Sequence, residues 1–325
     1  MAENFEGIYE ESLESSWQEE IKDSYAKIKG GARITIDETG VTELLAGSFD
    51  THIHAGPDSY GRRQWTEADV AVKACRYRMG GVVFKCQSSA SSAREVFVQQ
   101  IADRYAEENN LKKIKVFSGV VLSRAVGGIN PYAVEASLAM GGKYVWTPTR
   151  DASHHHRAEG QEGGIEVCRE DGRLIPEMYE IFDMMAKKDA VLGISHQSTR
   201  ERFLLVREAK ARGIKRLVIE HPQMHISRMT IDQMSDIRKM GAYLGICYAS
   251  AVPCFLGNIR NRGEVAEIIR TLGTDMLVSQ TDLTQLQTVD PVTGLRLFAK
   301  TLLSLGITEK EIRKIFVDNC EALLL

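Results

Sequence analysis

The strongest constraint on the fold is a pattern that repeats along most of the chain. A short apolar run is followed by a polar or Gly/Pro-rich break and then by a stretch with helical periodicity, at intervals of roughly 30 residues. Several runs are apolar at consecutive positions, as expected of parallel strands covered on both faces. The eight runs are 48–50, 81–85, 115–121, 143–146, 191–194, 216–219, 242–246 and 276–278. We therefore predict an α/β fold with one (β/α)8 TIM barrel over residues 48–325.

The first 47 residues do not follow this pattern. Residues 1–30 have the spacing of an acidic amphipathic helix, and residues 32–46 contain two β-rich runs around Glu38-Thr39-Gly40. This favours a short N-terminal arm over residues 1–47, made of a helix plus a short β-hairpin. The barrel then forms a single domain.

Charge and cysteine content narrow the functional classes. The net charge is −3 and no basic block stands out, which argues against a nucleic-acid or anionic-membrane partner. No apolar run approaches the roughly 18 residues of a membrane span, and the acidic N-terminus lacks the apolar core of a signal peptide. The six cysteines form no CxxC pair, which is typical of reduced thiols. We expect a cytoplasmic protein that acts on a small molecule. A homo-oligomer is a further expectation, without a specific signal behind it.

Histidines and one aspartate follow the predicted strands at their carboxyl ends. His52 and His54 end the first strand, His196 ends the fifth, His221 ends the sixth, and Asp282 follows the eighth. These strand ends converge at one mouth of a barrel, where active sites of this fold lie. Residues i and i+2 of a strand share a face, so both side chains of the His-x-His pair should point the same way. Imidazoles with a carboxylate suit Zn first, with Mn, Fe or Ni as alternatives, and leave a position open for water.

This arrangement resembles the amidohydrolase superfamily over residues 47–325. The closing segment ITEKEIRKIFVDNCEALLL is similar to that superfamily's terminal helix. The stretches GGINPYAVEASLAMGGKYVWTPT, HAGPD and IEHPQ resemble, more narrowly, an uncharacterised branch of metal-dependent hydrolases named only by a domain of unknown function.

The resemblance implies a role for each of these residues. His52 and His54 would bind the more buried metal together with Asp282, and His196 and His221 would bind a second metal where one is present. Asp282 would also be the catalytic general base that takes a proton from the attacking water.

Lys85 marks a departure from the superfamily pattern. Related binuclear proteins often bridge their metals with a carbamylated lysine or a glutamate from the fourth strand, but here that strand ends in TPTRD, and Lys85 ends the second strand instead. A lysine is rarely buried unless it is paired or modified. As a carbamate Lys85 would be a metal ligand that bridges two ions, and as an amine it would form a salt bridge or bind an anionic substrate. The sequence leaves one metal or two undecided.

Further residues near the barrel mouth are candidates for substrate binding: Arg124, Arg150, His155 and Tyr248. His155 stands in a run of three histidines, which cannot all face one point. Glu220 precedes His221 and is expected to point away from the site, into packing or a surface pair.

The preferred function is hydrolysis of an amide, lactone or other ester-like bond of a small molecule by metal-activated water. A metal-dependent decarboxylase and a phosphoesterase are the alternatives that the same ligands allow. A non-enzymatic alternative is a barrel that binds a metal or ligand without catalysis, and the complete ligand set with Asp282 argues against it. The substrate depends on the loops after the strands and cannot be read from the fold.

Overall fold

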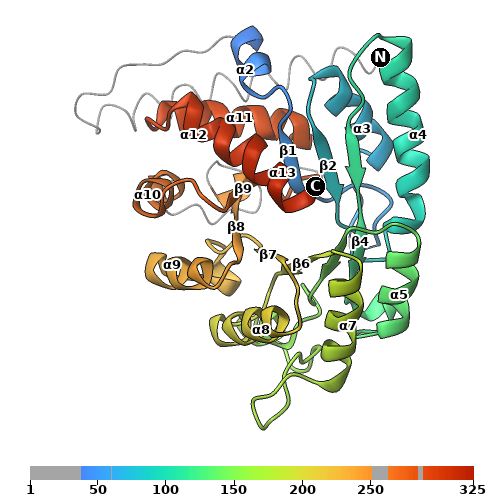
Figure 1. Cartoon of the computed structure of the whole chain (residues 1–325), viewed down its shortest axis with the longest axis vertical. Helices are drawn as coiled ribbons and strands as arrows, with labels where there is room; N and C mark the ends of the chain where they lie inside the picture. Colours follow the sequence, from blue (N-terminus) through green and yellow to red (C-terminus); the bar gives the residue numbers. More distant parts are fainter. Residues whose placement is uncertain (1–37, 60, 251–262, 285–287) are drawn as a thin grey trace. The chain divides into compact units, whose positions relative to one another are not determined.

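The computed structural model describes residues 38–59, 61–250, 263–284 and 288–325. Parallel strands alternate with helices along this part of the chain, and Figure 1 shows the helices outside the strands. The strands are β1 (Phe49–Ile53), β2 (Gly81–Phe84), β3 (Lys115–Phe117), β4 (Gly119–Val121), β5 (Tyr144–Trp146), β6 (Val191–Ile194), β7 (Arg216–Ile219), β8 (Tyr243–Cys247) and β9 (Leu277–Gln280). The helices are α2 (Glu38–Leu44), α3 (Glu67–Arg76), α4 (Ser92–Glu108), α5 (Pro131–Ala139), α6 (Ser153–Ala158), α7 (Pro176–Lys187), α8 (Thr199–Ala211), α9 (Ile231–Lys239), α10 (Gly263–Leu272), α11 (Pro291–Ser304), α12 (Glu309–Arg313) and α13 (Asn319–Leu324), with short turns η1 (Arg124–Val126), η2 (His225–Ser227), η3 (Tyr248–Ser250) and the π-turn η4 (Lys314–Asp318).

The strands are hydrogen-bonded in chain order and close into the predicted barrel. The third predicted strand is interrupted at Ser118, so that β3 pairs with β2 and β4 pairs with β5. The order continues through β6, β7, β8 and β9. The Asp282 amide then donates to the His52 carbonyl at 3.0 Å, and the His54 amide donates to the Leu283 carbonyl at 3.1 Å. The first and last strands therefore meet, and the predicted barrel fold is confirmed.

The barrel interior and the helix caps explain why these elements form. Apolar side chains from most strands pack together with side chains of α13 into one buried cluster. Helix α3 begins with a capping box in which Thr66 and Asp69 bond each other's backbone, and α9 begins with the same device from Thr230 and Gln233. Across the described ranges, no helix has the length and apolar content needed to cross a bilayer.

The start of the described chain differs from the sequence prediction. Residues 38–44 form helix α2, where the pattern predicts the turn and second strand of a hairpin. Val41 and Leu44, spaced three apart, bury one face of this helix, and Glu38 pairs with Arg296 and Lys300 of α11. Tertiary packing thus outweighs the β-propensity of Val41 and Thr42. The predicted helix at residues 1–30 and the first strand of the hairpin lie outside the described residues.

Candidate metal centre and active site

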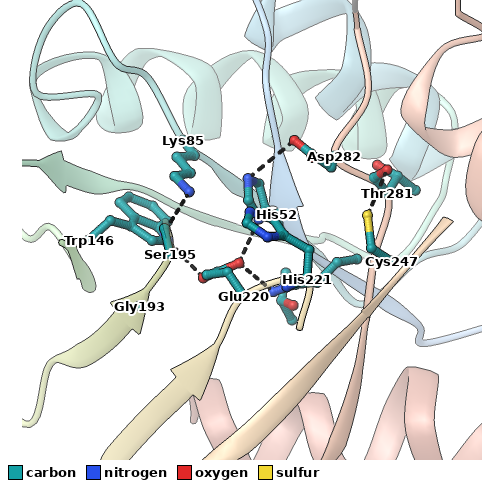
Figure 2. A network of polar contacts seen from close by, with 12 residues as sticks. His52, Lys85, Trp146, Gly193, Ser195, Glu220, His221, Cys247, Thr281 and Asp282 are labelled. Carbon is teal, nitrogen blue, oxygen red and sulfur yellow. Dashed lines mark hydrogen bonds and ion pairs between the residues drawn. The ribbon is translucent and has the colours of Figure 1, made fainter. Parts of the chain in front are cut away.

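The first strand and the last strand bring two imidazoles and one carboxylate together. His52 lies in β1 and His54 follows it, and their Nε2 atoms are 3.3 Å apart. Asp282 Oδ1 lies 3.2 Å from His54 Nε2 and 3.5 Å from His52 Nε2. All three side chains are buried, and Figure 2 shows Asp282 above the His52 ring. Among the described residues, these three form a group whose ligand atoms lie close enough to share one ion.

The tautomers of the two histidines fit a metal ion. His54 Nδ1 lies 3.0 Å from the Lys85 carbonyl oxygen, which can only accept, so Nδ1 carries the proton. His52 Nδ1 lies 2.5 Å from the Glu220 carboxylate and donates to it in the same way. Both Nε2 lone pairs then face each other and the Asp282 carboxylate. Three acceptor atoms that meet at one point are the chemistry of a divalent cation site.

Burial and neighbouring charges determine the protonation states of His54, His221 and Asp282. Burial lowers the pKa of the His54 imidazole to about 4 and that of His221 to about 3, so both rings are neutral near pH 7. Burial raises the pKa of the Asp282 carboxyl, but the neighbouring His52 and His54 outweigh it and hold the pKa well below its usual range. Neutral imidazoles and an ionised carboxylate are the protonation states in which these groups bind metals.

Glu220 lies inside the barrel, which corrects the expectation that it points away. Its carboxylate accepts from His52 Nδ1, from Trp146 Nε1 at 3.0 Å and from Gln280 Nε2 at 2.7 Å. Burial raises the pKa of Glu220, but the electrostatic interaction and the hydrogen bond with His52 outweigh it and bring the pKa to about 2. A buried carboxylate with three donors fixes the ring that it holds, as carboxylates that accept from metal-binding histidines do. Figure 2 shows this network.

The alternation of side chains along β7 explains why the Glu220 side chain points into the barrel. Val218 belongs to the core cluster of the barrel, so the residue two positions on faces the same way. His221 has a φ of +33°, which takes the chain out of strand geometry directly after Glu220. Both neighbouring side chains therefore reach the barrel mouth. The signal was present in the Val218–Glu220 spacing.

Two glycines make room for the groups that bind Glu220. A Cβ at Gly193 of β6 would overlap the Trp146 indole and lie 2.8 Å from Glu220 Oε1, and a Cβ at Gly245 of β8 would overlap the Gln280 amide. Both positions therefore require glycine for a close side-chain approach rather than for backbone freedom.

We expect Gly193→Ala to lower the free energy of unfolding by about 1–3 kcal/mol, because the added methyl group overpacks the barrel interior. It should also weaken metal binding, since the displaced Glu220 no longer fixes His52. Thermal or urea unfolding and metal titration would measure both effects. Gly61→Ala is the matched control, because its Cβ would meet nothing within 4 Å. Wild-type stability and metal affinity in Gly193→Ala would contradict this account.

His196 and His221 lie beside the metal group, by which we mean His52, His54 and Asp282, as expected. The His221 ring is 5.6 Å from the His52 ring and 5.1 Å from the His196 ring. His221 Nδ1 is buried, and no described residue forms a hydrogen bond with it. His196 Nδ1 lies 2.8 Å from His155 Nδ1, and the two rings stack. A buried nitrogen without a partner fits a ligand atom of a second ion.

Lys85 lies between the two histidine groups. Its Nζ donates to Ser195 Oγ at 3.0 Å and lies 5.7 Å from the centre of the Trp146 ring. Burial lowers the pKa of the Lys85 amine, against the opposing charges of Glu220 and Asp282. A buried amine with a lowered pKa is the form that can become a carbamate. Ligation by Lys85 stays a prediction.

A cavity of about 350 Å³ opens above these groups. Of the predicted substrate-binding residues, Arg150 and His155 line it. Arg124 and Tyr248 do not belong to its described lining: the Arg124 side chain is 63% exposed, and the Tyr248 ring packs edge-on against Phe298. Arg124 begins η1 and Tyr248 begins η3, and a role for either in substrate binding stays a prediction.

Three buried residues near the site were missed besides Glu220. Gln87 and Gln223 line the cavity, and Arg202 of α8 donates to the carbonyl oxygens of Ser195 and Glu220, which precede His196 and His221. Gln87 is two positions after Lys85, so strand alternation could have indicated it. Gln223 and Arg202 carry no comparable signal in the sequence.

Comparison with solved structures shows the class that this fold belongs to. Similar structures include an amidohydrolase from Pseudomonas aeruginosa (16% identity, TM-score 0.58, covering 87% of this chain and 98% of that one). The probable dipeptidase PvdM from Pseudomonas aeruginosa is 13% identical with a TM-score of 0.59, covering 89% of this chain and 98% of that one. The phosphotriesterase homology protein from Escherichia coli, complexed with phosphate in its active site, is 11% identical with a TM-score of 0.54, covering 86% and 99%. The fold is that of the amidohydrolase- and phosphotriesterase-like barrels, as the sequence resemblance implied.

The sequence itself assigns the chain to a narrower group. Residues 47–245 match the family described as "Family of unknown function (DUF6282)", and the chain belongs to that family. No curated protein matches the sequence.

Proposed function

We propose that this protein is a metal-dependent hydrolase of the amidohydrolase superfamily. The observation that carries the proposal is the convergence of two imidazole Nε2 lone pairs and the Asp282 carboxylate at the floor of a cavity. A divalent ion bound there would polarise the scissile bond and lower the pKa of water toward neutrality. Zn is the first expectation for its identity, with Mn, Fe or Ni as alternatives.

The residues of the chain would divide the remaining work. Asp282 is ionised and faces the cavity floor, so it can accept a proton from the attacking water and return it to the leaving group. Glu220 holds His52 in the ligating tautomer. His196 and His221 would hold a second ion, with Lys85 as bridging carbamate where that ion is present.

The proposed substrate is a small molecule with an amide, lactone or other ester-like bond. A cavity of about 350 Å³ lies within the range of small-molecule sites. The probable dipeptidase and the phosphotriesterase homology protein share the fold at low identity, which supports hydrolysis as a class and leaves the bond to be found.

Metal analysis would test the proposal directly. We expect wild-type protein to bind at least one transition-metal ion per chain, and His52→Ala, His54→Ala and His221→Ala each to lose bound metal with the fold retained. The reason is that the ligands lie at strand ends above the apolar core, which does not depend on them. His156→Ala is the control, because His156 lies in α6 outside the described cavity lining, and its Nδ1 bonds to the Glu162 carbonyl. Wild-type metal content in all three ligand variants would refute the ligand assignment.

A substrate panel would test the reaction class. Wild-type protein should hydrolyse a member of a panel of small amides, lactones, aryl esters and phosphotriesters, and chelation should abolish the activity until metal is restored. Release of carbon dioxide from carboxylate substrates would point to a decarboxylase instead. Metal binding without turnover of any compound would favour the binding-barrel reading.

A further inference from the structure

Two glutamine amides in the cavity wall have polar atoms without partners. Gln223 is 4% exposed, and neither its Nε2 nor its Oε1 has a hydrogen-bond partner among the described residues. Gln87 is 5% exposed, and its Oε1 also has none. Both residues line the cavity that contains the metal group. One follows β2 and the other follows β7, so they approach the cavity from different strands.

Their backbones, in contrast, are fixed. The Gln87 carbonyl accepts from Ser123 Oγ at 2.7 Å. Gln223 lies in a tight segment in which the Met224 amide donates to the His221 carbonyl and the Met229 amide donates to the Pro222 carbonyl, each at 2.9 Å. Burying a polar atom without a partner is costly, and native proteins rarely do so. Fixed backbones with unpaired side-chain amides are typical of a site whose partner is a ligand.

The pattern of these atoms specifies the ligand chemistry. A glutamine amide presents one donor and one acceptor side by side, which pair with an N–H beside a C=O through two parallel hydrogen bonds. An ester or lactone has the C=O but no N–H, and it would leave both glutamine oxygens unpaired. A hydroxyl group can make only one of the two parallel bonds.

We propose that Gln87 and Gln223 bind the substrate and select one that presents an amide edge, an N–H beside a C=O, over its ester or lactone counterpart. The inference rests on the proposed function, because it takes the same cavity as the active site. It adds the direction of substrate selection and the residues that determine it.

Binding of two matched probes to the zinc-loaded full chain would test this inference. Glutarimide carries a ring N–H flanked by carbonyl groups, and N-methylglutarimide carries a methyl group in place of that hydrogen. We expect wild-type protein to bind glutarimide about tenfold or more tightly than N-methylglutarimide, because loss of the N–H leaves buried acceptors unpaired. Isothermal titration would give both affinities, and ¹⁵N spectra would show the Gln223 side-chain amide shift with glutarimide alone.

Leucine variants would assign the preference to the two glutamines. Gln223→Leu and Gln87→Leu should each reduce the preference for glutarimide, while Tm stays unchanged or rises, because an unpaired buried amide is replaced by an apolar group of similar shape. Gln161→Leu is the matched control: Gln161 lines the same cavity but is exposed, so the preference should persist.

Several results would overturn the inference. They are equal binding of both probes by wild-type protein, failure of either to bind at millimolar concentration, and retention of the preference in both leucine variants. A marked fall in Tm of Gln223→Leu would show that its amide is paired within the protein. Ring opening is followed in the same samples, so hydrolysis without the predicted preference would refute this inference and leave the proposed function standing.

Discussion

The Asp282→Asn variant is expected to keep much of its metal and to lose about 10²-fold or more in kcat. Asn keeps the size of the side chain and one oxygen that can ligate, but its neutral amide is a very poor base. Asp282 Oδ1 lies within 3.5 Å of both His52 Nε2 and His54 Nε2, so the ligand role and the base role meet in one carboxylate. The measurement is kcat at matched metal occupancy, on whichever panel compound the wild-type protein hydrolyses.

A structural role for Asp282 would give a different result. An aspartate after a strand often caps the next helix, and Asn would replace it there at almost no cost. Along the described chain, the helix after β9 is α11, and Asp290 caps it through the amides of Val292 and Thr293. Asp183→Asn, which alters an exposed carboxylate paired with Arg212, is the control for a general loss of charge. Wild-type turnover in Asp282→Asn would exclude it as the base and favour the decarboxylase or binding-barrel readings.

The Glu220→Gln variant is expected to weaken metal binding about 10- to 100-fold. Every group around this carboxylate is a donor: His52 Nδ1 and Gln280 Nε2 on one oxygen, and Trp146 Nε1 on the other. A glutamine must turn its NH₂ toward one of these donors, so either the His52 ring or the indole loses its acceptor. The free energy of unfolding should also fall by about 1–3 kcal/mol, because a buried donor is left unpaired.

Metal titration with a competing chelator would measure the change in affinity, and unfolding of the metal-free protein would measure the change in stability. Glu107→Gln is the matched control, because that carboxylate lies on the surface beside Lys113. The pattern expected of a positioning residue is weaker metal binding together with retained folding. Wild-type metal affinity in Glu220→Gln would show that metal binding by His52 does not depend on the carboxylate charge of Glu220.

The fold could be predicted because its signal is spread over the whole chain. Each barrel strand was visible as an apolar run, and the positions of His52, His54, His196, His221 and Asp282 followed from the strand ends. The site prediction depended on the face of the strand to which each side chain points, and the alternation of a strand determines that face. What it missed depends on local departures from strand geometry, such as the positive φ of His221, through which His221 reaches the mouth beside the inward-facing Glu220.

Other parts of the prediction depended on contacts that no local pattern contains. Helix α2 forms because it packs against α11, which is more than 250 residues away in the sequence. Arg124 and Tyr248 follow strands, as predicted, but they lie in short turns and are not among the described residues that line the cavity. Ligation by Lys85, the number of metal ions and the homo-oligomer stay predictions.

The metal group straddles the junction at which the barrel closes. His52 and His54 come from the first strand, Asp282 comes from the end of the last, and the backbone bonds between these strands lie at the same place. During synthesis, the N-terminal pair emerges long before its carboxylate partner, so a nascent chain holds only half of a ligand set. An ion bound by all three would link the first strand to the last. Its binding energy would stabilise the closed barrel and not the open one. Occupancy by metal would therefore report that the last strand has been inserted.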